Sequence, residues 1–223
     1  MVVRQARSEV TRRKIIAAAV DLFNDIGYSN TGLGDIVERA GMTKGALYHH
    51  FSSKEALAEA IIEEASEILL TTFQGICRSS APALENIIHG VLVVVQLGNT
   101  DKLVRMGALL LRMFAKFSEA STHNYGVWLA EMGTQARRAQ AEGDLRADVD
   151  AQQAAEFIVG SMLGAELVSN AVSGGQDLLE RVTLTWRLLL PAIASEQSLP
   201  YLREFLARES LRGLGHAPTS GMA

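Results

Sequence analysis

The chain has 223 residues, of which 48% are hydrophobic, and a formal net charge of −4. This length and apolar content suffice for a globular core in one large domain or two smaller ones. Cys77 is the only cysteine, so an intrachain disulfide is excluded. The first residues lack the apolar segment of a signal peptide, and the run VLVVV at 91–95 is too short to cross a bilayer, which takes about 20 apolar residues. We therefore expect a soluble, cytoplasmic protein without a membrane span.

Charge is distributed unevenly along the chain. Residues 1–54 contain eight basic and five acidic residues, a net charge of +3, whereas the remainder contains 13 basic and 20 acidic residues, a net charge of −7. A small basic binding domain on an acidic body would show this asymmetry. Ordinary scatter of surface charge is the alternative.

Three helices are predicted in the basic segment. The first begins near Ser8 and ends at Gly27, because apolar residues recur at the spacing of one helical face. Thr31 is expected to cap a second, short helix that ends at Gly41. Thr43 is expected to cap a third helix, within the sequence TKGALYHHF at 43–51.

Further helices are predicted along the rest of the chain. Ser52 and Glu55 have the spacing of a capping box for a long helix toward Cys77. Asp150 and Gln153 mark another helix start. The remaining helices are expected at about 82–97, 101–118, 123–142, 151–172, 176–194 and 199–210. With no alternating strand pattern and no internal repeat, the predicted fold class is all-α, and the Gly- and Ser-containing tail at 212–223 is expected to be disordered.

The second and third helices, joined by the short sequence GMT, have the form of a helix-turn-helix. On the third helix, Lys44, Gly45, Tyr48 and His49 share one face, and Leu47 lies on the opposite face. A recognition helix needs this division between an apolar back and a polar front that enters the major groove. Gly45 would allow close approach of DNA, because it has no Cβ.

The segment TRRKIIAAAVDLFNDIGYSNTGLGDIVERAGMTKGALYHHFSSKEAL resembles the N-terminal domain of the TetR family of transcriptional regulators over residues 10–58. Within that family, the sequences RQARSEVTRRKII, TKGALY and LLLPAIA look most like the γ-butyrolactone receptor subgroup of actinobacteria. The resemblance implies a three-helix DNA-binding domain at 1–54 and a helical ligand-binding and dimerisation domain at 55–211. It also implies a dimer that binds operator DNA.

The resemblance further implies which residues meet DNA. Thr43, Lys44 and Gly45 would open the recognition helix against bases and phosphate, and the rings of Tyr48 and His49 would contact DNA. Lys54 would clamp a phosphate at the start of the next helix, and Thr31 would cap the second helix near the DNA backbone. From the N-terminus, basic side chains would follow the backbone or reach a minor groove: Arg4, Arg7 and Arg12. Gly32 and Gly34 depart from the family pattern, which favours specificity from residues 43–49.

Enzymatic and metal-binding interpretations have little support in the sequence. GLGDIV at 32–37 follows no predicted strand and lacks the third glycine of a dinucleotide fingerprint. Adjacent His49 and His50 point about 100° apart on a helix, which is unsuitable for a shared metal ion. Cys77 is expected to be a small buried hydrophobe. We therefore expect no cofactor, no metal and no enzymatic activity, with an all-helical enzyme or a protein-interaction module as the alternative.

The acidic body is expected to hold an apolar ligand, since helix bundles commonly contain such cavities. Trp128 looks like the counterpart of a tryptophan that lines the ligand pocket in the butyrolactone-receptor subgroup; a purely structural role is the alternative. The predicted ligand-binding set is Trp128, Phe114, Met113, Leu110, Phe157 and Met162. Candidate ligands are a butyrolactone-like signal, a fatty acyl species or a hydrophobic drug. A body without a ligand, under other control, also remains open.

A homodimer is expected because one short recognition helix covers only a few base pairs, and two are needed about 34 Å apart. The helix pair 151–172 and 176–194 is the predicted dimer surface. The first helix has a strip of small residues and the second an apolar stripe: Gly160, Ser161, Gly164 and Ala165, and Leu178, Val182, Thr185 and Leu189. Together these features predict a dimeric repressor that a small apolar ligand releases from a palindromic operator.

Overall fold

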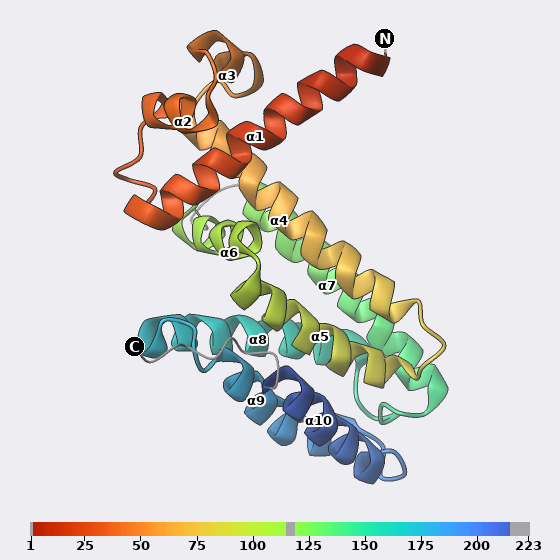
Figure 1. Cartoon of the computed structure of the whole chain (residues 1–223). Helices are drawn as coiled ribbons and strands as arrows, with labels where there is room; N and C mark the ends of the chain where they lie inside the picture. Colours follow the sequence, from red (N-terminus) through yellow and green to blue (C-terminus); the bar gives the residue numbers. More distant parts are fainter. Residues whose placement is uncertain (1, 115–118, 215–223) are drawn as a thin grey trace. The chain divides into compact units, whose positions relative to one another are not determined.

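The structure is a computed structural model that describes the backbone of residues 2–114 and 119–214, and the side chains of residues 8–114 and 123–212 (Figure 1). Within these ranges the chain forms helices and no strand, apart from one isolated bridge between Leu145 and Ala194. The helices are α1 (Val2–Ile26), α2 (Leu33–Ala40), α3 (Lys44–His50), α4 (Lys54–Cys77), α5 (Ala83–Thr100), α6 (Lys102–Phe114), α7 (Glu119–Glu142), α8 (Ala151–Ser173), α9 (Leu178–Ile193) and α10 (Leu199–Leu214). The predicted all-α fold is confirmed.

The helices group into two compact units. The N-terminal unit comprises Met1–Leu69 and Thr100–Thr122, and the C-terminal unit comprises Leu70–Asn99 and His123–Ala223. The N-terminal unit extends past residue 54 and includes α6, so a functional boundary at residue 54 stays a prediction. The predicted disordered tail lies largely outside the described residues, except that α10 continues to Leu214.

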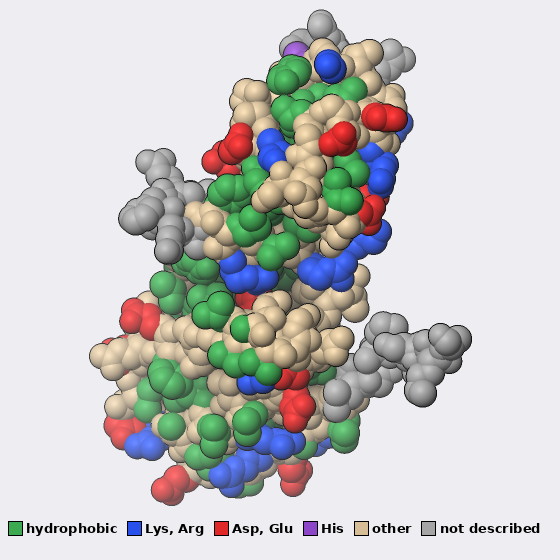
Figure 2. All heavy atoms as spheres, turned by 90° about the vertical axis from the view of Figure 1, so that its left-hand side faces the viewer, with side chains coloured by type: hydrophobic (Ala, Val, Ile, Leu, Met, Phe, Trp, Pro, Cys, Tyr) green, Lys and Arg blue, Asp and Glu red, His purple; other side chains and the backbone are tan. Residues whose placement is uncertain are grey.

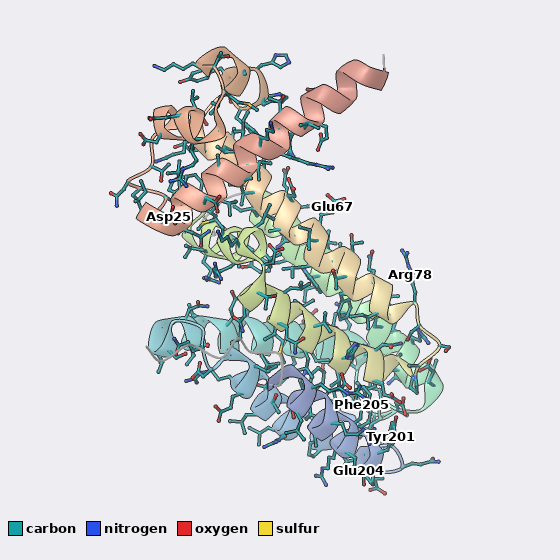
Figure 3. The ribbon with its side chains drawn as sticks, in the orientation of Figure 1. Asp25, Glu67, Arg78, Tyr201, Glu204 and Phe205 are labelled. Carbon is teal, nitrogen blue, oxygen red and sulfur yellow. The ribbon has the colours of Figure 1, made fainter. Side chains whose placement is uncertain are left out.

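The N-terminal unit has its own apolar core, built from α1 to α4 and closed by α6. Phe23, Ile36 and Leu47 are fully buried there, together with Met106 and Leu110 of α6. Gly107 brings α6 close to α4, because a Cβ at this position would lie 2.3 Å from the Ala65 Cβ. Outside the core, Asp25 near the end of α1 (Figure 3) pairs with Arg39 of α2 at 3.5 Å. The buried Met106 and Leu110 and the close approach at Gly107 make α6 an integral part of the N-terminal unit.

The C-terminal unit is organised around α5, whose residues are mostly buried, and around Trp186 of α9, which is 0% exposed. The α9 helix packs against both α8 and α10. At the α8–α9 junction, Asp177 accepts hydrogen bonds from Arg181 Nε (2.7 Å), Ser169 Oγ (2.5 Å) and Ser173 Oγ (2.6 Å). These donors stabilise the carboxylate, Arg181 most of all, and hold the pKa of Asp177 well below its usual range. The junction is therefore fixed by a charged network.

On the same unit, α10 is tied to α5 by polar contacts. Glu209 Oε2 lies 2.6 Å from Nδ1 of His89. Tyr201 and Phe205 lie one turn apart on α10 (Figure 3), and Phe205 packs partly against the core. The C-terminal helix is thus a fixed part of the bundle.

Two of the predicted helix caps are confirmed. Thr43 Oγ1 accepts the Ala46 N–H at 3.2 Å, and Asp150 accepts the Gln153 N–H at 2.8 Å. Both residues have extended backbone angles and lie directly before their helices, as N-caps do.

Two other predicted caps were wrong by one residue. Thr31 does not cap α2, because its hydroxyl donates back to the Gly27 carbonyl at 2.9 Å. Gly32 occupies the cap position, and its N–H donates to the Asp35 carboxylate at 2.8 Å. Ser53 rather than Ser52 caps α4, by accepting the Ala56 N–H at 3.1 Å. In addition, α1 begins at Val2, six residues before the predicted Ser8.

Candidate nucleic-acid interface and ligand site

The α3 helix has one buried and one exposed face, as the sequence predicts. Leu47 and Phe51 are buried in the core of the N-terminal unit, whereas Lys44, Gly45, Tyr48 and His49 are exposed. Tyr48 is 56% exposed, which is unusual for so large a ring. The polar front is therefore available to an external partner while the apolar back anchors the helix.

Gly45 has no structural role that the chain itself explains. A Cβ built on it meets no described atom within 4 Å, so packing inside the protein does not require a glycine here. A glycine is unfavourable in a helix by about 1 kcal/mol relative to alanine. A close approach by another molecule on the exposed face would account for its presence.

The turn between α2 and α3 fixes the angle at which α3 is presented. Gly41 adopts the left-handed conformation, with φ 64°, and its N–H donates to the Glu38 carbonyl. The Met42 N–H donates to the Val37 carbonyl at 3.1 Å. This pattern ends α2 as a glycine cap does, and Thr43 starts α3 two residues later. The two helices form a helix-turn-helix.

The other predicted DNA-contacting residues are placed less favourably. Thr31 is 2% exposed, so its side chain has little surface to offer a phosphate. Lys54 Nζ donates to two carbonyl oxygens within the unit, those of Tyr28 and Thr31, each at 3.0 Å. Arg12 pairs with Glu64 at 3.2 Å and lies over the Phe51 ring. The side chains of Arg4 and Arg7 lie outside the described residues. The DNA contacts of this group stay predictions.

The six predicted ligand-binding residues are divided between the two units. Leu110 and Phe114 belong to the N-terminal unit, where Leu110 is buried and Phe114 contacts the Tyr28 ring. Met113, also on α6, is half exposed. A shared cavity for the whole set stays a prediction.

In the C-terminal unit, Trp128 packs partly buried against the core, with its ring 5.4 Å from the Phe73 ring in a T-shaped arrangement. Met162 packs against the same core, whereas Phe157 is exposed on α8. The structure thus brings Trp128 and Met162 to one core and leaves Phe157 on the surface.

Beside Trp128 lies a polar chain that sequence reasoning missed. Gln74 donates to Glu131 at 2.9 Å, and Gln135 donates to the other oxygen of Glu131 at 2.9 Å. The buried Oε1 of Gln135 and the buried Nε1 of Trp186 have no hydrogen-bond partner among the described residues. Residues 128, 131 and 135 share one face of α7, so the helical spacing from Trp128 is a signal that would have pointed to Gln135.

Three side chains bear on the enzymatic and metal-binding interpretations. Cys77 is buried, and burial raises the pKa of its thiol to about 12, which makes it an unreactive apolar residue as expected. The rings of His49 and His50 lie 5.3 Å apart in a T-shaped arrangement. No group of three potential metal-ligating side chains is present among the described ones.

The predicted apolar stripe on α9 was wrong as a dimer surface. Leu178, Val182 and Leu189 are buried in the core of their own unit, with Val182 0% exposed. The solvent-facing side of α9 carries other apolar residues, among them the exposed Leu184 and Leu188. Apolar residues recur on both sides of α9, and only packing shows which side faces the core.

The exposed apolar residues of α8 and α9 form a set that we call the outer apolar face: Phe157, Leu163, Leu167, Val168 and Val172 of α8, and Leu184 and Leu188 of α9. Val172 and Leu188 are 71% and 73% exposed. Gly160 and Gly164 of the predicted small-residue strip are also exposed on α8. Hydrophobic side chains are visible at the surface in Figure 2, among polar ones. By length and composition alone, α8 is also long and apolar enough to cross a membrane. The helices α5 and α6 taken together are as well, although the chain bends between them.

The fold and the site define a helix-turn-helix protein with a separate helical bundle. Residues 15–61 match the family of bacterial regulatory proteins of the TetR type, and residues 115–184 match a tetracycline-repressor-like C-terminal domain. The chain is 32% identical over 200 residues to the A-factor receptor protein of Streptomyces griseus, covering 90% of this chain and 70% of the receptor. The chain therefore belongs to the TetR family, whose members are DNA-binding transcriptional regulators and not enzymes.

Solved structures agree with this assignment. A full-length TetR regulator from Streptomyces fradiae, TylP, is 34% identical with a TM-score of 0.67, over 99% of this chain and 95% of that one. A γ-butyrolactone receptor described as ArpA-like is 28% identical with a TM-score of 0.75, over 92% and 99% of the two chains. CprB from Streptomyces coelicolor, solved with its biological operator sequence, is 28% identical with a TM-score of 0.72, over 92% and 99%.

Proposed function

We propose that the protein is a cytoplasmic repressor that binds a palindromic operator as a homodimer and is released by a small, largely apolar ligand of the γ-butyrolactone type. The observation that carries the proposal is the exposed face of α3. It combines an unexplained glycine, Gly45, with the exposed ring of Tyr48 and the positive charge of Lys44. Such a face suits the major groove, where side chains contact base edges and phosphates.

Support for a dimer comes from the outer apolar face. Large exposed apolar patches mark interaction sites, and this one spans two adjacent helices whose junction is fixed by the Asp177 network. The exposed Gly160 and Gly164 would let a partner helix approach closely. A second copy of this chain would cover the face by two-fold symmetry, as most homodimers do. The charged residues Glu156 and Glu166 within α8 favour a protein partner over a membrane interior.

Support for a ligand comes from the core beside Trp128 and from the relatives. The A-factor receptor and the ArpA-like protein are named as receptors, the second of them for γ-butyrolactone. In this chain, the buried Gln135 Oε1 has no partner among the described residues and can accept a hydrogen bond. A lactone that carries a hydroxyl group offers a matching donor on an apolar body. It would act as an inducer by binding the DNA-free conformation of the dimer more tightly.

A single-tryptophan variant tests the ligand. The Trp186→Phe background loses no hydrogen bond, because Trp186 Nε1 has no described partner. Titration with γ-butyrolactones that carry an alkyl chain should quench or shift the Trp128 fluorescence over the concentration range that releases operator DNA. In that background Trp128→Ala should bind operator within a few-fold of the parent but lose about 1–3 kcal/mol of coupling to the inducer.

Two results would contradict a role for Trp128 in ligand binding. A normal inducer response in Trp128→Ala would place the ligand elsewhere in the bundle. Unfolding of that variant would favour a structural role, since truncation of a core aromatic residue costs about 3–5 kcal/mol. If no lactone changes the fluorescence or releases DNA, the control of the repressor must be sought in another ligand class or in protein abundance.

A further inference from the structure

Lys54 is the first residue of α4, and its ammonium group is held within the protein. Its Nζ atom lies 3.0 Å from the Tyr28 carbonyl oxygen, 3.0 Å from the Thr31 carbonyl oxygen and 4.3 Å from the centre of the Tyr28 ring. A lysine has three N–H donors, and two of them are used by these carbonyls. The positive charge is further stabilised over the face of the tyrosine ring.

The turn that Lys54 grips is itself well ordered. The Thr31 N–H donates to the Tyr28 carbonyl at 3.3 Å, and the Thr31 hydroxyl donates to the Gly27 carbonyl at 2.9 Å. The Tyr28 ring packs in T-shaped contacts against Phe23 and Phe114, at 5.1 and 5.4 Å between ring centres. Tyr28 thus links α1 and α6 to the residues that lead into α2.

These contacts lie at both ends of the helix-turn-helix. The turn at 28–31 leads directly into α2, and residues 51–54 follow directly on α3. Phe51 ends α3 with its N–H bonded to the Leu47 carbonyl at 2.9 Å, and its ring is buried. Lys54 therefore joins the segment that enters the helix-turn-helix to the segment that leaves it, across 26 and 23 residues of sequence.

We propose that Lys54, together with Tyr28, is a positioning residue for DNA recognition, which sets the orientation of α2 and α3 and does not clamp a phosphate. This inference rests on the proposed DNA-reading function of α3. A lysine that turned toward a phosphate would leave the Thr31 carbonyl without its described donor, would take one of two donors from the Tyr28 carbonyl, and would abandon the Tyr28 ring. Lys44, exposed at the start of α3, is by contrast placed to neutralise a phosphate.

Salt dependence separates these two roles. Each phosphate contact adds about 0.9 to the magnitude of the negative slope of log affinity against log salt. The slope is measured with a mixed-sequence DNA duplex long enough for two half-sites, for the wild type, Lys54→Met and the matched control Lys44→Ala. Methionine preserves the length and the apolar stem of the lysine while removing its donors. For each protein we also compare the affinity for a selected operator with the affinity for the mixed-sequence duplex. Both affinities are measured at a temperature far below the melting temperature.

We expect Lys54→Met to keep the wild-type salt slope and to melt at a lower temperature. The ratio of its affinity for the operator to its affinity for the mixed-sequence duplex should fall at least about tenfold, which is the effect of losing one base contact. In Lys44→Ala the magnitude of the salt slope should instead fall by about 0.9 for each lost phosphate contact, and the melting temperature should stay at the wild-type value. The operator ratio distinguishes positioning from a merely structural role, because a folded protein with α2 and α3 correctly placed would keep its specificity.

The proposal would be overturned if the magnitude of the salt slope fell in Lys54→Met as it does in Lys44→Ala. It would also be overturned if Lys54→Met kept the wild-type ratio of operator affinity to mixed-sequence affinity. Tyr28→Leu provides a second variant, which keeps the charge at position 54 and decides the matter if Lys54→Met does not fold. It should lose operator preference at an unchanged slope, and a wild-type preference would overturn the proposal. If the proposed DNA-binding function were itself wrong, the wild type would show no preference for an operator, so this outcome can be told apart from failure of the Lys54 proposal.

Discussion

Replacing Tyr48 with alanine is expected to abolish specific operator binding while leaving the fold intact. The ring is more than half exposed on the front of α3, and the core contacts of that helix are made by Leu47 and Phe51 instead. Loss of a good base contact costs about 1–3 kcal/mol in each half-site. Because the proposed dimer reads two half-sites, the loss in affinity should be about 30-fold to 20,000-fold.

Gly45→Val tests the same face by addition of atoms. A Cβ at this position meets no described atom within 4 Å, and valine is no worse than glycine in a helix, so stability should be equal or slightly higher. Two branched methyl groups per half-site would nevertheless hold the backbone of α3 away from the groove. Binding is followed by a mobility shift, and helical content and melting by circular dichroism. A loss of fold in both variants would show that the face assigned to DNA belongs to the core.

The second large effect is expected at the outer apolar face. The double substitution of Leu167 and Leu188 by glutamate should convert the proposed dimer into a folded monomer. Both side chains are exposed in the single chain, so its own core is unaffected. In a symmetric dimer the change would bury four charges, each at a cost of several kcal/mol. The monomer should lose at least about 100-fold in operator affinity, because the second half-site no longer adds to the first.

Analytical ultracentrifugation gives the mass of each variant directly. Leu211→Glu on α10 is the matched control, because Leu211 is also a highly exposed leucine. The control should stay dimeric and bind operator normally. A double variant that remains dimeric would mean that the two copies associate through another surface.

The sequence predicts the reading helix well because its signals are local. Thr43 precedes the helix directly, and the alternation of Leu47 and Phe51 with Tyr48 and His49 follows from the helical period. The exposure of Tyr48 and the burial of Leu47 both follow from that pattern. The Thr31 error shows the limit of the same reasoning, since a threonine before a helix can also turn its hydroxyl back to an earlier carbonyl.

Other features depend on packing that no local pattern contains. The two sides of α9 are both apolar, and the burial of Val182 against the exposure of Leu188 is decided by where α8 and α10 pack. The carbonyls that hold Lys54 come from more than 20 residues earlier, so no pattern near Lys54 indicates them, and the family resemblance implies a phosphate contact instead. The inclusion of α6 in the N-terminal unit depends on Gly107 meeting Ala65, two residues far apart in the chain.

Selection of bound sequences from a random pool of duplex DNA tests the central claim most directly. The protein is expected to enrich a palindrome whose half-sites lie about one helical turn apart, or a multiple of it. Native mass spectrometry of the complex should then show two copies of the chain, or a multiple of two, on each palindrome. Enrichment of no sequence, or of a single unrepeated site bound by one copy, would contradict a dimeric operator-reading repressor.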